Sequence, residues 1–151
     1  MNKLYQKSEI WFAVIWIIIY VVGTSFAENI SEGIGLSKSI TFIFHVVISI
    51  IVITWLNKNG LFGKYGICKP NAPASKFLYY IPLLIIISCN LWFGVTMNLT
   101  ITVSILYAGS MICVGFLEEI IFRGFLFKAM AKDSVKAAII VSSITFGIGH
   151  I

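Results

Sequence analysis

Two glutamates and the only arginine of the chain lie within or at the edge of a hydrophobic segment, at Glu118, Glu119 and Arg123. A charged side chain at the centre of a membrane helix costs about 2.5 to 3.5 kcal/mol on insertion scales, so such residues usually have a function. In an α-helix, Glu119 and Arg123 are four positions apart on one face, with the acid first. We therefore predict that they form an ion pair.

Glu118 differs from Glu119 because it has no arginine one helical turn away. It lies five residues before Arg123 and about 100° around the helix from Glu119. A poorly hydrated carboxylate beside a second carboxylate is the setting in which enzymes tune a general base toward neutral pH. Glu118 is therefore the candidate general base.

A histidine follows on the next hydrophobic segment, in Phe146-Gly147-Ile148-Gly149-His150. Ten residues separate Glu118 from Lys128, and fourteen separate Lys136 from His150, which correspond to about 15 and 21 Å of helix. These depths allow adjacent antiparallel helices to bring Glu118 and His150 together, with water entering from the cytoplasm. Because a histidine at membrane depth suggests function by default, we favour a functional His150 over a packing role.

The composition indicates that membrane helices position these residues. Hydrophobic residues make up 59% of the chain, charged residues 11%, and the mean hydropathy is +0.98. A spanning helix needs about 20 mostly apolar residues. Five segments fit this length or nearly do, near residues 10–27, 39–56, 77–97, 101–127 and 135–151. We predict an all-α, polytopic transmembrane helical bundle in one membrane domain, 1–151, whose last span is truncated.

Lysines concentrate in alternate connections between these segments. They are Lys3 and Lys7, then Lys58, Lys64, Lys69 and Lys76, and finally Lys128, Lys132 and Lys136. The first connection has only Lys38 among its basic residues, and the connection near residues 98–100 has no charge. By the positive-inside rule, this pattern predicts a multi-pass protein of the cell membrane with a cytoplasmic N-terminus.

Several other features are open to more than one interpretation. Ser25-Phe26-Ala27 resembles a signal-peptide cleavage site, although we favour an uncleaved first helix because further spans follow. For His45, inside the second segment, we favour a packing role. Ser142, Ser143 and Thr145 are expected to be polar contacts between helices. The net charge of +5 has no basic face associated with it, so no nucleic-acid partner is expected.

The two motifs together resemble those of a known family. Glu118-Glu119-Ile120-Ile121-Phe122-Arg123 resembles Glu-Glu-x-x-x-Arg, and Phe146 to His150 resembles Phe-x-x-x-His, of the CPBP intramembrane glutamic endopeptidases. This family comprises type II CAAX prenyl proteases and bacterial abortive-infection and bacteriocin-processing or immunity proteins. The resemblance implies that Glu118 activates a water, that His150 positions it, and that Glu119 and Arg123 hold the site in shape. It implies a membrane-associated or prenylated peptide or protein substrate, cleaved near the cytoplasmic membrane face.

Members of the family carry a further motif on a later helix, a histidine followed four residues on by asparagine or aspartate. The sequence ends at Ile151, before any such helix. We therefore expect an N-terminal fragment or truncated form. The missing motif includes an oxyanion-stabilising group, and loss of such a donor typically costs about 10² to 10³ in rate, so reduced or absent activity is expected of the truncated chain.

Other functions remain as alternatives. A zinc enzyme is less favoured than catalysis without a cofactor, because catalytic zinc usually has three protein ligands and His-Glu-x-x-His is absent. A non-enzymatic membrane immunity or regulatory protein could use the same scaffold. A transporter or channel fragment with a Glu-Arg proton path is also compatible with intramembrane charges. The endopeptidase is the favoured interpretation.

Overall fold

The computed structural model describes residues 1–69, 73–86 and 100–148, and these residues form helices and no strands. The elements are α1 (Asn2–Lys7), α2 (Glu9–Ile34), α3 (Ser39–Lys58), the 3₁₀ helix η1 (Ala74–Tyr80), α5 (Ile101–Glu118), the π-helix η2 (Glu119–Phe127), α6 (Lys128–Met130) and α7 (Val135–Ile148). The predicted all-α class is confirmed.

Three helices are long and apolar enough to cross a membrane: Glu9–Ile34, Ser39–Lys58 and the continuous Ile101–Met130. Two shorter apolar helices, Ser75–Ile86 and Val135–Ile148, fall in the other two predicted segments. The remainder of those two segments, 87–97 and 149–151, lies outside the described residues. Together the apolar helices indicate a multi-pass membrane protein.

The first spanning helix continues beyond the apolar run that predicted it. The run was expected to end near residue 27, whereas α2 continues to Ile34, and Gly35 ends it with φ 77°. This left-handed conformation is one that glycine adopts without steric cost. Within the extension, Glu28 forms an ion pair with Lys38 at 2.7 Å.

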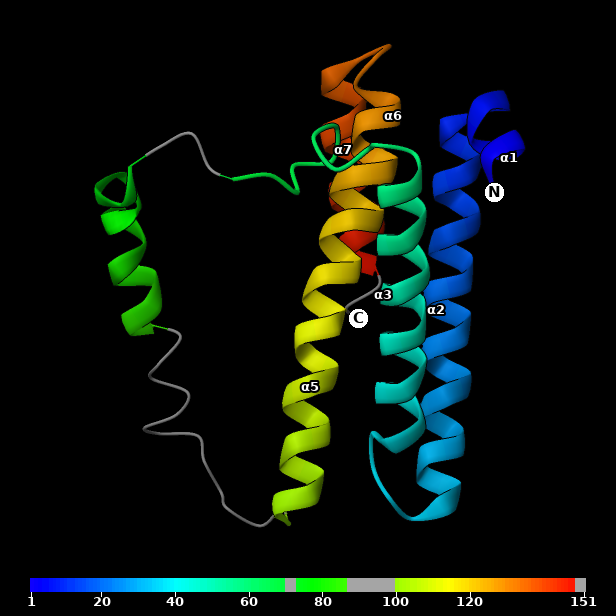
Figure 1. The fold of residues 1–151 in the computed structure, drawn as a ribbon, viewed down its shortest axis with the longest axis vertical. Coiled ribbons are helices and arrows are strands. Elements are labelled where there is room, and N and C mark those ends of the chain that lie inside the picture. The colour runs from blue at the N-terminus through cyan, green and yellow to red at the C-terminus, as the bar shows by residue number, and fades with distance from the viewer. Residues whose placement is uncertain (70–72, 87–99, 149–151) are drawn as a thin grey trace.

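The long helices lie side by side, as Figure 1 shows. Helix α3 packs against both α2 and α5, and α2 also packs against η2. The two outer helices, α2 and α5, meet where Tyr20 of α2 donates a hydrogen bond to Glu118 at the end of α5. Helix α7 packs against η2 and α6.

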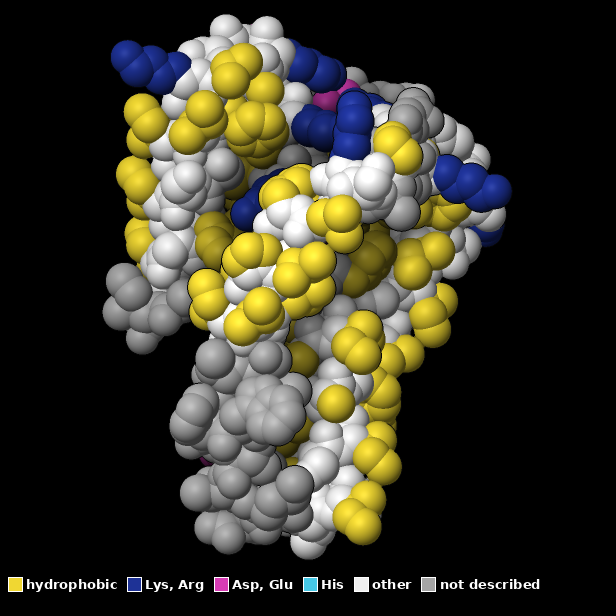
Figure 2. Space-filling model, turned by 90° about the vertical axis from the view of Figure 1, so that its left-hand side faces the viewer, with side chains coloured by type: hydrophobic (Ala, Val, Ile, Leu, Met, Phe, Trp, Pro, Cys, Tyr) yellow, Lys and Arg dark blue, Asp and Glu magenta, His cyan; other side chains and the backbone are white. Residues whose placement is uncertain are grey.

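The lysine-rich segments meet at one end of the bundle. Glu9 Oε1 accepts hydrogen bonds from Lys64 at 2.9 Å and from Lys132 at 2.8 Å, joining the start of α2 to the connections after α3 and after α6. Burial lowers the pKa of Lys64, but its hydrogen bonds to Glu9 and Tyr5 outweigh this effect and raise the pKa overall. In the face shown in Figure 2, lysine and arginine side chains lie mainly toward this end. We call it the lysine-rich end.

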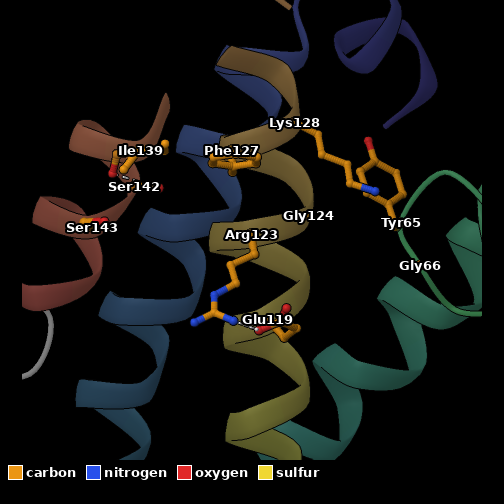
Figure 3. A pocket seen from close by; sticks show the side chains of 10 residues that line it. All are labelled: Tyr65, Gly66, Glu119, Arg123, Gly124, Phe127, Lys128, Ile139, Ser142 and Ser143. Atoms are coloured by element: carbon orange, nitrogen blue, oxygen red, sulfur yellow. Dashed lines mark hydrogen bonds and ion pairs between the residues drawn. The ribbon is translucent and has the colours of Figure 1, made fainter. Parts of the chain in front are cut away.

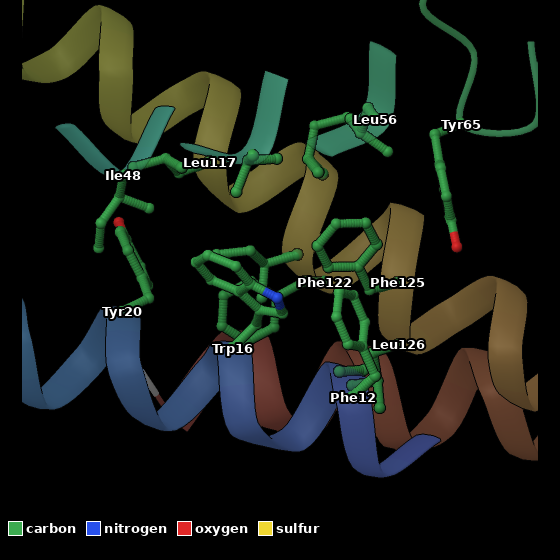
Figure 4. Close-up of a cluster of buried hydrophobic side chains, with 14 of the residues drawn as sticks. Phe12, Trp16, Tyr20, Ile48, Leu56, Tyr65, Leu117, Phe122, Phe125 and Leu126 are labelled. Atoms are coloured by element: carbon green, nitrogen blue, oxygen red, sulfur yellow. The ribbon is translucent and has the colours of Figure 1, made fainter. Parts of the chain in front are cut away.

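A cluster of aromatic and aliphatic side chains fills the bundle near the lysine-rich end. Phe12 of α2 contacts Phe125 of η2 with ring centroids 5.1 Å apart, and contacts Trp55 of α3 at 4.8 Å. Figure 4 shows rings from α2 and η2 interleaved between the helices. Phe12, Trp16, Leu117, Phe122 and Phe125 are all buried. We call this set of buried side chains the aromatic core.

The segment after Glu118 is π-helical, whereas the sequence predicted an ordinary membrane helix. Its backbone hydrogen bonds join residues five apart, so each turn contains more residues than an α-helical turn. Such stretches are rare and often occur at functional sites. In this chain the change of helix type begins directly after Glu118 and includes Glu119 and Arg123.

Candidate active site

Glu118, at the end of α5, is held by a tyrosine from the first long helix. The Tyr20 hydroxyl donates a hydrogen bond to Glu118 Oε1 at 3.1 Å. Tyr20 is only 7% exposed, and Glu118 is half-buried. Sequence reasoning missed this partner because the two residues are 98 positions apart. The sequence did contain one signal, the Tyr20 hydroxyl inside an apolar run. A buried tyrosine hydroxyl usually has a hydrogen-bond partner, so a polar partner on another helix could have been expected.

Glu118 also lines a cavity of about 310 Å³ between the three long helices. Helix α2 contributes Tyr20 and Thr24, α3 contributes His45, and α5 contributes Ser110 in addition to Glu118. Helices α2 and α5 lie on either side of α3, so α2 and α5 form the two walls of the cavity and α3 forms its floor. We call this cavity the polar groove.

His45 lies on the floor of the polar groove and is 1% exposed. Its Nε2 is hydrogen-bonded to Thr24 Oγ1 at 3.0 Å, and its Nδ1 to Ser110 Oγ at 3.1 Å. Both ring nitrogens thus have hydroxyl partners, one from each neighbouring helix. This arrangement agrees with the predicted packing role, since polar side chains often join membrane helices in this way.

Glu119 and Arg123 form the predicted ion pair, but on a different side of the helix from the polar groove. The Arg123 Nη1 to Glu119 Oε2 distance is 3.3 Å, and the side chains are 75% and 61% exposed. They line a cavity of about 440 Å³ near the lysine-rich end, together with Ser142 and Ser143 of α7. Figure 3 shows Arg123 extending toward Glu119 across from these two serines. The consecutive glutamates therefore face two separate cavities.

Gly124 allows the connection after α3 to approach η2 closely. A Cβ at this position would lie 3.3 Å from Tyr65 Cδ1, tighter than most such contacts. The Lys128 ammonium donates a hydrogen bond to the Lys64 carbonyl oxygen on the same side. These contacts fix one wall of the cavity that Glu119 and Arg123 line (Figure 3).

The second motif approaches the first through an aromatic contact. The rings of Phe122 and Phe146 lie 5.6 Å apart at an interplanar angle of 83°. The described part of α7 ends at Ile148, so His150 lies outside the described residues. Its position relative to Glu118 stays a prediction. In the part of the chain that the structure describes, no three His, Cys, Asp or Glu side chains form a group that could hold a metal ion.

Comparison with known proteins identifies one family. Residues 98–151 match the Rce1-like family, described as type II CAAX prenyl endopeptidase Rce1-like. The matched region contains both motifs, and the match supports the resemblance to the CPBP group. No curated protein and no solved structure matches the chain.

Proposed function

Taking the chain as a multi-pass membrane protein of the CPBP family, we propose that it is an intramembrane endopeptidase in which Glu118 activates the attacking water. One observation carries this proposal: Glu118 is fixed by Tyr20 in a polar groove within an otherwise apolar bundle. The family match over residues 98–151 supports peptidase chemistry at this position. Carboxylates are rare inside membrane helices and are usually functional there.

In the proposed reaction, Glu118 acts first as a base and then as an acid. It takes a proton from a water while the water oxygen bonds to the carbonyl carbon of the substrate. The tetrahedral intermediate then collapses, the C–N bond breaks, and Glu118 returns the proton to the leaving amine nitrogen. Tyr20 holds one carboxylate oxygen and so fixes the direction of the other, which favours a water within about 2.6 to 3.2 Å. His150 is proposed to position this water.

Glu119 and Arg123 are proposed to act as positioning residues rather than as proton carriers. Their ion pair joins two positions of η2 directly after Glu118. A rigid η2 keeps the end of α5, and with it the Glu118 carboxylate, at a constant angle to α2. An exposed ion pair stabilises a protein by only about 0.2 to 1 kcal/mol. We therefore expect Glu119 and Arg123 to act mainly by holding the Glu118 carboxylate in position.

The proposed substrate is a membrane-associated or prenylated peptide whose scissile bond is cleaved at the depth of Glu118, in the half of the bundle nearer the lysine-rich end. We assign this end to the cytoplasmic side, with the N-terminus there, because lysine-rich connections favour that side. Glu118 would then be separated from Lys128 by the π-helix η2, within the cytoplasmic half of the membrane. A lipid-anchored peptide could reach this depth without leaving the bilayer.

A cleavage assay tests the proposed function. Membranes containing the protein, expressed from its complete reading frame, are incubated with a farnesylated peptide ending in a CAAX sequence. We expect release of the C-terminal tripeptide, identified by mass spectrometry, and slower release from the same peptide without its farnesyl group. Absence of release above membranes lacking the protein would contradict the proposal.

Catalysis by a glutamate-activated water predicts that chelators leave the activity intact. Treating the membranes with 1,10-phenanthroline or EDTA is expected to change the cleavage rate less than about twofold, since zinc supplies no part of the proposed chemistry. The rate is measured before and after dialysis against each chelator. A loss that only added zinc restores would instead support the metal-dependent alternative.

The Tyr20 hydrogen bond predicts a defined effect of Tyr20→Phe. Hydrogen bonds to charged groups contribute about 1.5 to 3 kcal/mol, so we expect kcat to fall at least about tenfold. KM should stay within about twofold, because Tyr20 orients the base and is not proposed to bind the peptide. The matched control is Tyr107→Phe, at a tyrosine that is 36% exposed. Equal kcat values for the two variants would show that Tyr20 does not position Glu118.

A further inference from the structure

The buried polar side chains of the described residues are concentrated along one line through the bundle. These buried residues are Ser31, Thr41, His45, Ser49 and Ser110. All except Ser49 belong to hydrogen-bonded sets that line the polar groove or continue from it toward the turn between α2 and α3.

The line begins at the turn between α2 and α3, opposite the lysine-rich end (Figure 1). There, Thr41 Oγ1 donates a hydrogen bond to Glu28 Oε2 at 3.0 Å, and Lys38 pairs with Glu28 Oε1 at 2.7 Å. Thr41 and Lys38 also line the polar groove, whose other limit is Glu118. The groove therefore extends from a charged pair near this turn to the candidate base.

The other end of the polar groove is closed. Directly beyond Tyr20 and Glu118, α2 and η2 pack together through the aromatic core, where Phe12 is 1% exposed and Leu117 is fully buried. The cavity of about 440 Å³ that Glu119 and Arg123 line near the lysine-rich end is not lined by Glu118. The described residues thus separate Glu118 from the lysine-rich end but not from the Lys38 turn.

The chemistry of the groove suits water. A volume of about 310 Å³ corresponds to roughly ten water molecules at about 30 Å³ each. The hydroxyls, imidazole and carboxylate that line it are groups whose exposure to lipid without hydrogen-bond partners is costly. Its rim includes Ser25 on α2 and Met111 on α5, both exposed.

We propose that the polar groove is a water-filled passage that connects Glu118 with the membrane surface at the Lys38 turn, opposite the lysine-rich end. This direction is the reverse of the cytoplasmic entry that the sequence suggested. The passage is a property of the bundle whether or not the chain is a peptidase. Only its use as the source of the attacking water rests on the proposed function.

Cysteine labelling tests the passage without any activity measurement. In a variant with Cys68, Cys89 and Cys113 replaced by serine, single cysteines are introduced as Ser25→Cys and Met111→Cys. The matched controls are Phe26→Cys and Ile112→Cys, which lie at the same depths on adjacent positions that do not line the groove. Phe26 is 67% and Ile112 is 75% exposed on the outer surface of the bundle.

Each variant is treated with a charged, membrane-impermeant maleimide in sealed vesicles of known orientation. A variant that keeps only Cys68 marks the lysine-rich side, and Ser37→Cys marks the opposite side. Labelling after solubilisation in denaturing detergent measures the total thiol of each sample. Two groove positions on different helices are used so that a folding defect in one variant does not decide the result.

We expect both groove cysteines to react from the Ser37 side at least about tenfold faster than their neighbours, because the reactive thiolate forms poorly in apolar surroundings. Reaction from the Cys68 side alone would overturn the proposal. So would equal rates at groove and control positions, or no reaction at either groove position. If labelling occurs as expected but no peptide is cleaved, the passage stands and only the proposed function fails.

Discussion

Replacing Glu118 by glutamine is expected to lower the rate of peptide cleavage by about 10²- to 10⁴-fold, the usual contribution of general acid–base catalysis. The amide keeps the size of the side chain and can still accept the Tyr20 hydrogen bond, but it cannot take a proton from water. Cleavage of the farnesylated peptide is measured at equal amounts of protein in the membrane. Thermal unfolding in detergent should show little change between the two proteins.

The neighbouring glutamate supplies the matched control. Glu119→Gln removes one charge from an ion pair whose side chains are both exposed, and it lies outside the polar groove. We expect a clearly smaller loss of rate than for Glu118→Gln, because the proposed role of Glu119 is to steady η2. Equal losses in the two variants would contradict the separate roles. Unchanged cleavage in Glu118→Gln would show that Glu118 is not the base, whereas the non-enzymatic immunity or regulatory alternative predicts that Glu118→Gln leaves the cellular phenotype intact.

Replacing Phe125 by alanine is expected to cause the largest loss of stability. The Phe125 ring contacts Phe12 at 5.1 Å, Trp55 at 6.0 Å and Tyr65 at 5.1 Å, and so joins α2, α3 and the following connection to η2. Removing a buried phenylalanine side chain typically costs about 3 to 5 kcal/mol, and membrane helices depend on such packing because lipid supplies no hydrophobic driving force between them. Unfolding is measured by titration with SDS in mixed micelles.

The Phe125→Ala substitution should also disturb the candidate active site, because the aromatic core holds α2 against η2 and thereby keeps Tyr20 beside Glu118. Phe125→Ala is therefore expected to reduce cleavage as well as stability. The control is Phe26→Ala, where the ring on α2 is 67% exposed and contacts little of the bundle. A loss of stability in Phe26→Ala as large as that in Phe125→Ala would argue against the described packing.

The helices were predictable to the extent that their signals are local. Apolar runs of membrane-spanning length predicted the helices that became α2, α3 and α5, because lipid requires every backbone polar group to be satisfied within its own segment. The end of α2 was less predictable. Its last turns contain Glu28, whose partner Lys38 lies across the turn, and hydropathy alone does not reveal that pairing.

The candidate site was predictable only in part, because spacing within one helix reveals local contacts but not contacts between residues far apart in the chain. The ion pair of Glu119 and Arg123 follows from spacing within one helix, and it is present. The hydrogen bond from Tyr20 to Glu118, and the inclusion of His45 in the same groove, depend on residues far apart in the chain. His150 and its proposed role stay predictions.

By itself, the sequence determined the all-α membrane class of the protein, the pairing of Glu119 with Arg123 and the clustering of lysines at alternate connections, since composition and short spacings carry that information. Only the tertiary structure decided which way each glutamate faces. Glu118 and Glu119 are consecutive, yet one lines the polar groove with α2 and α3 and the other lines a separate cavity with α7. That separation arises because two different sides of one helix are covered by different neighbours, and the choice of neighbours depends on packing across the whole bundle.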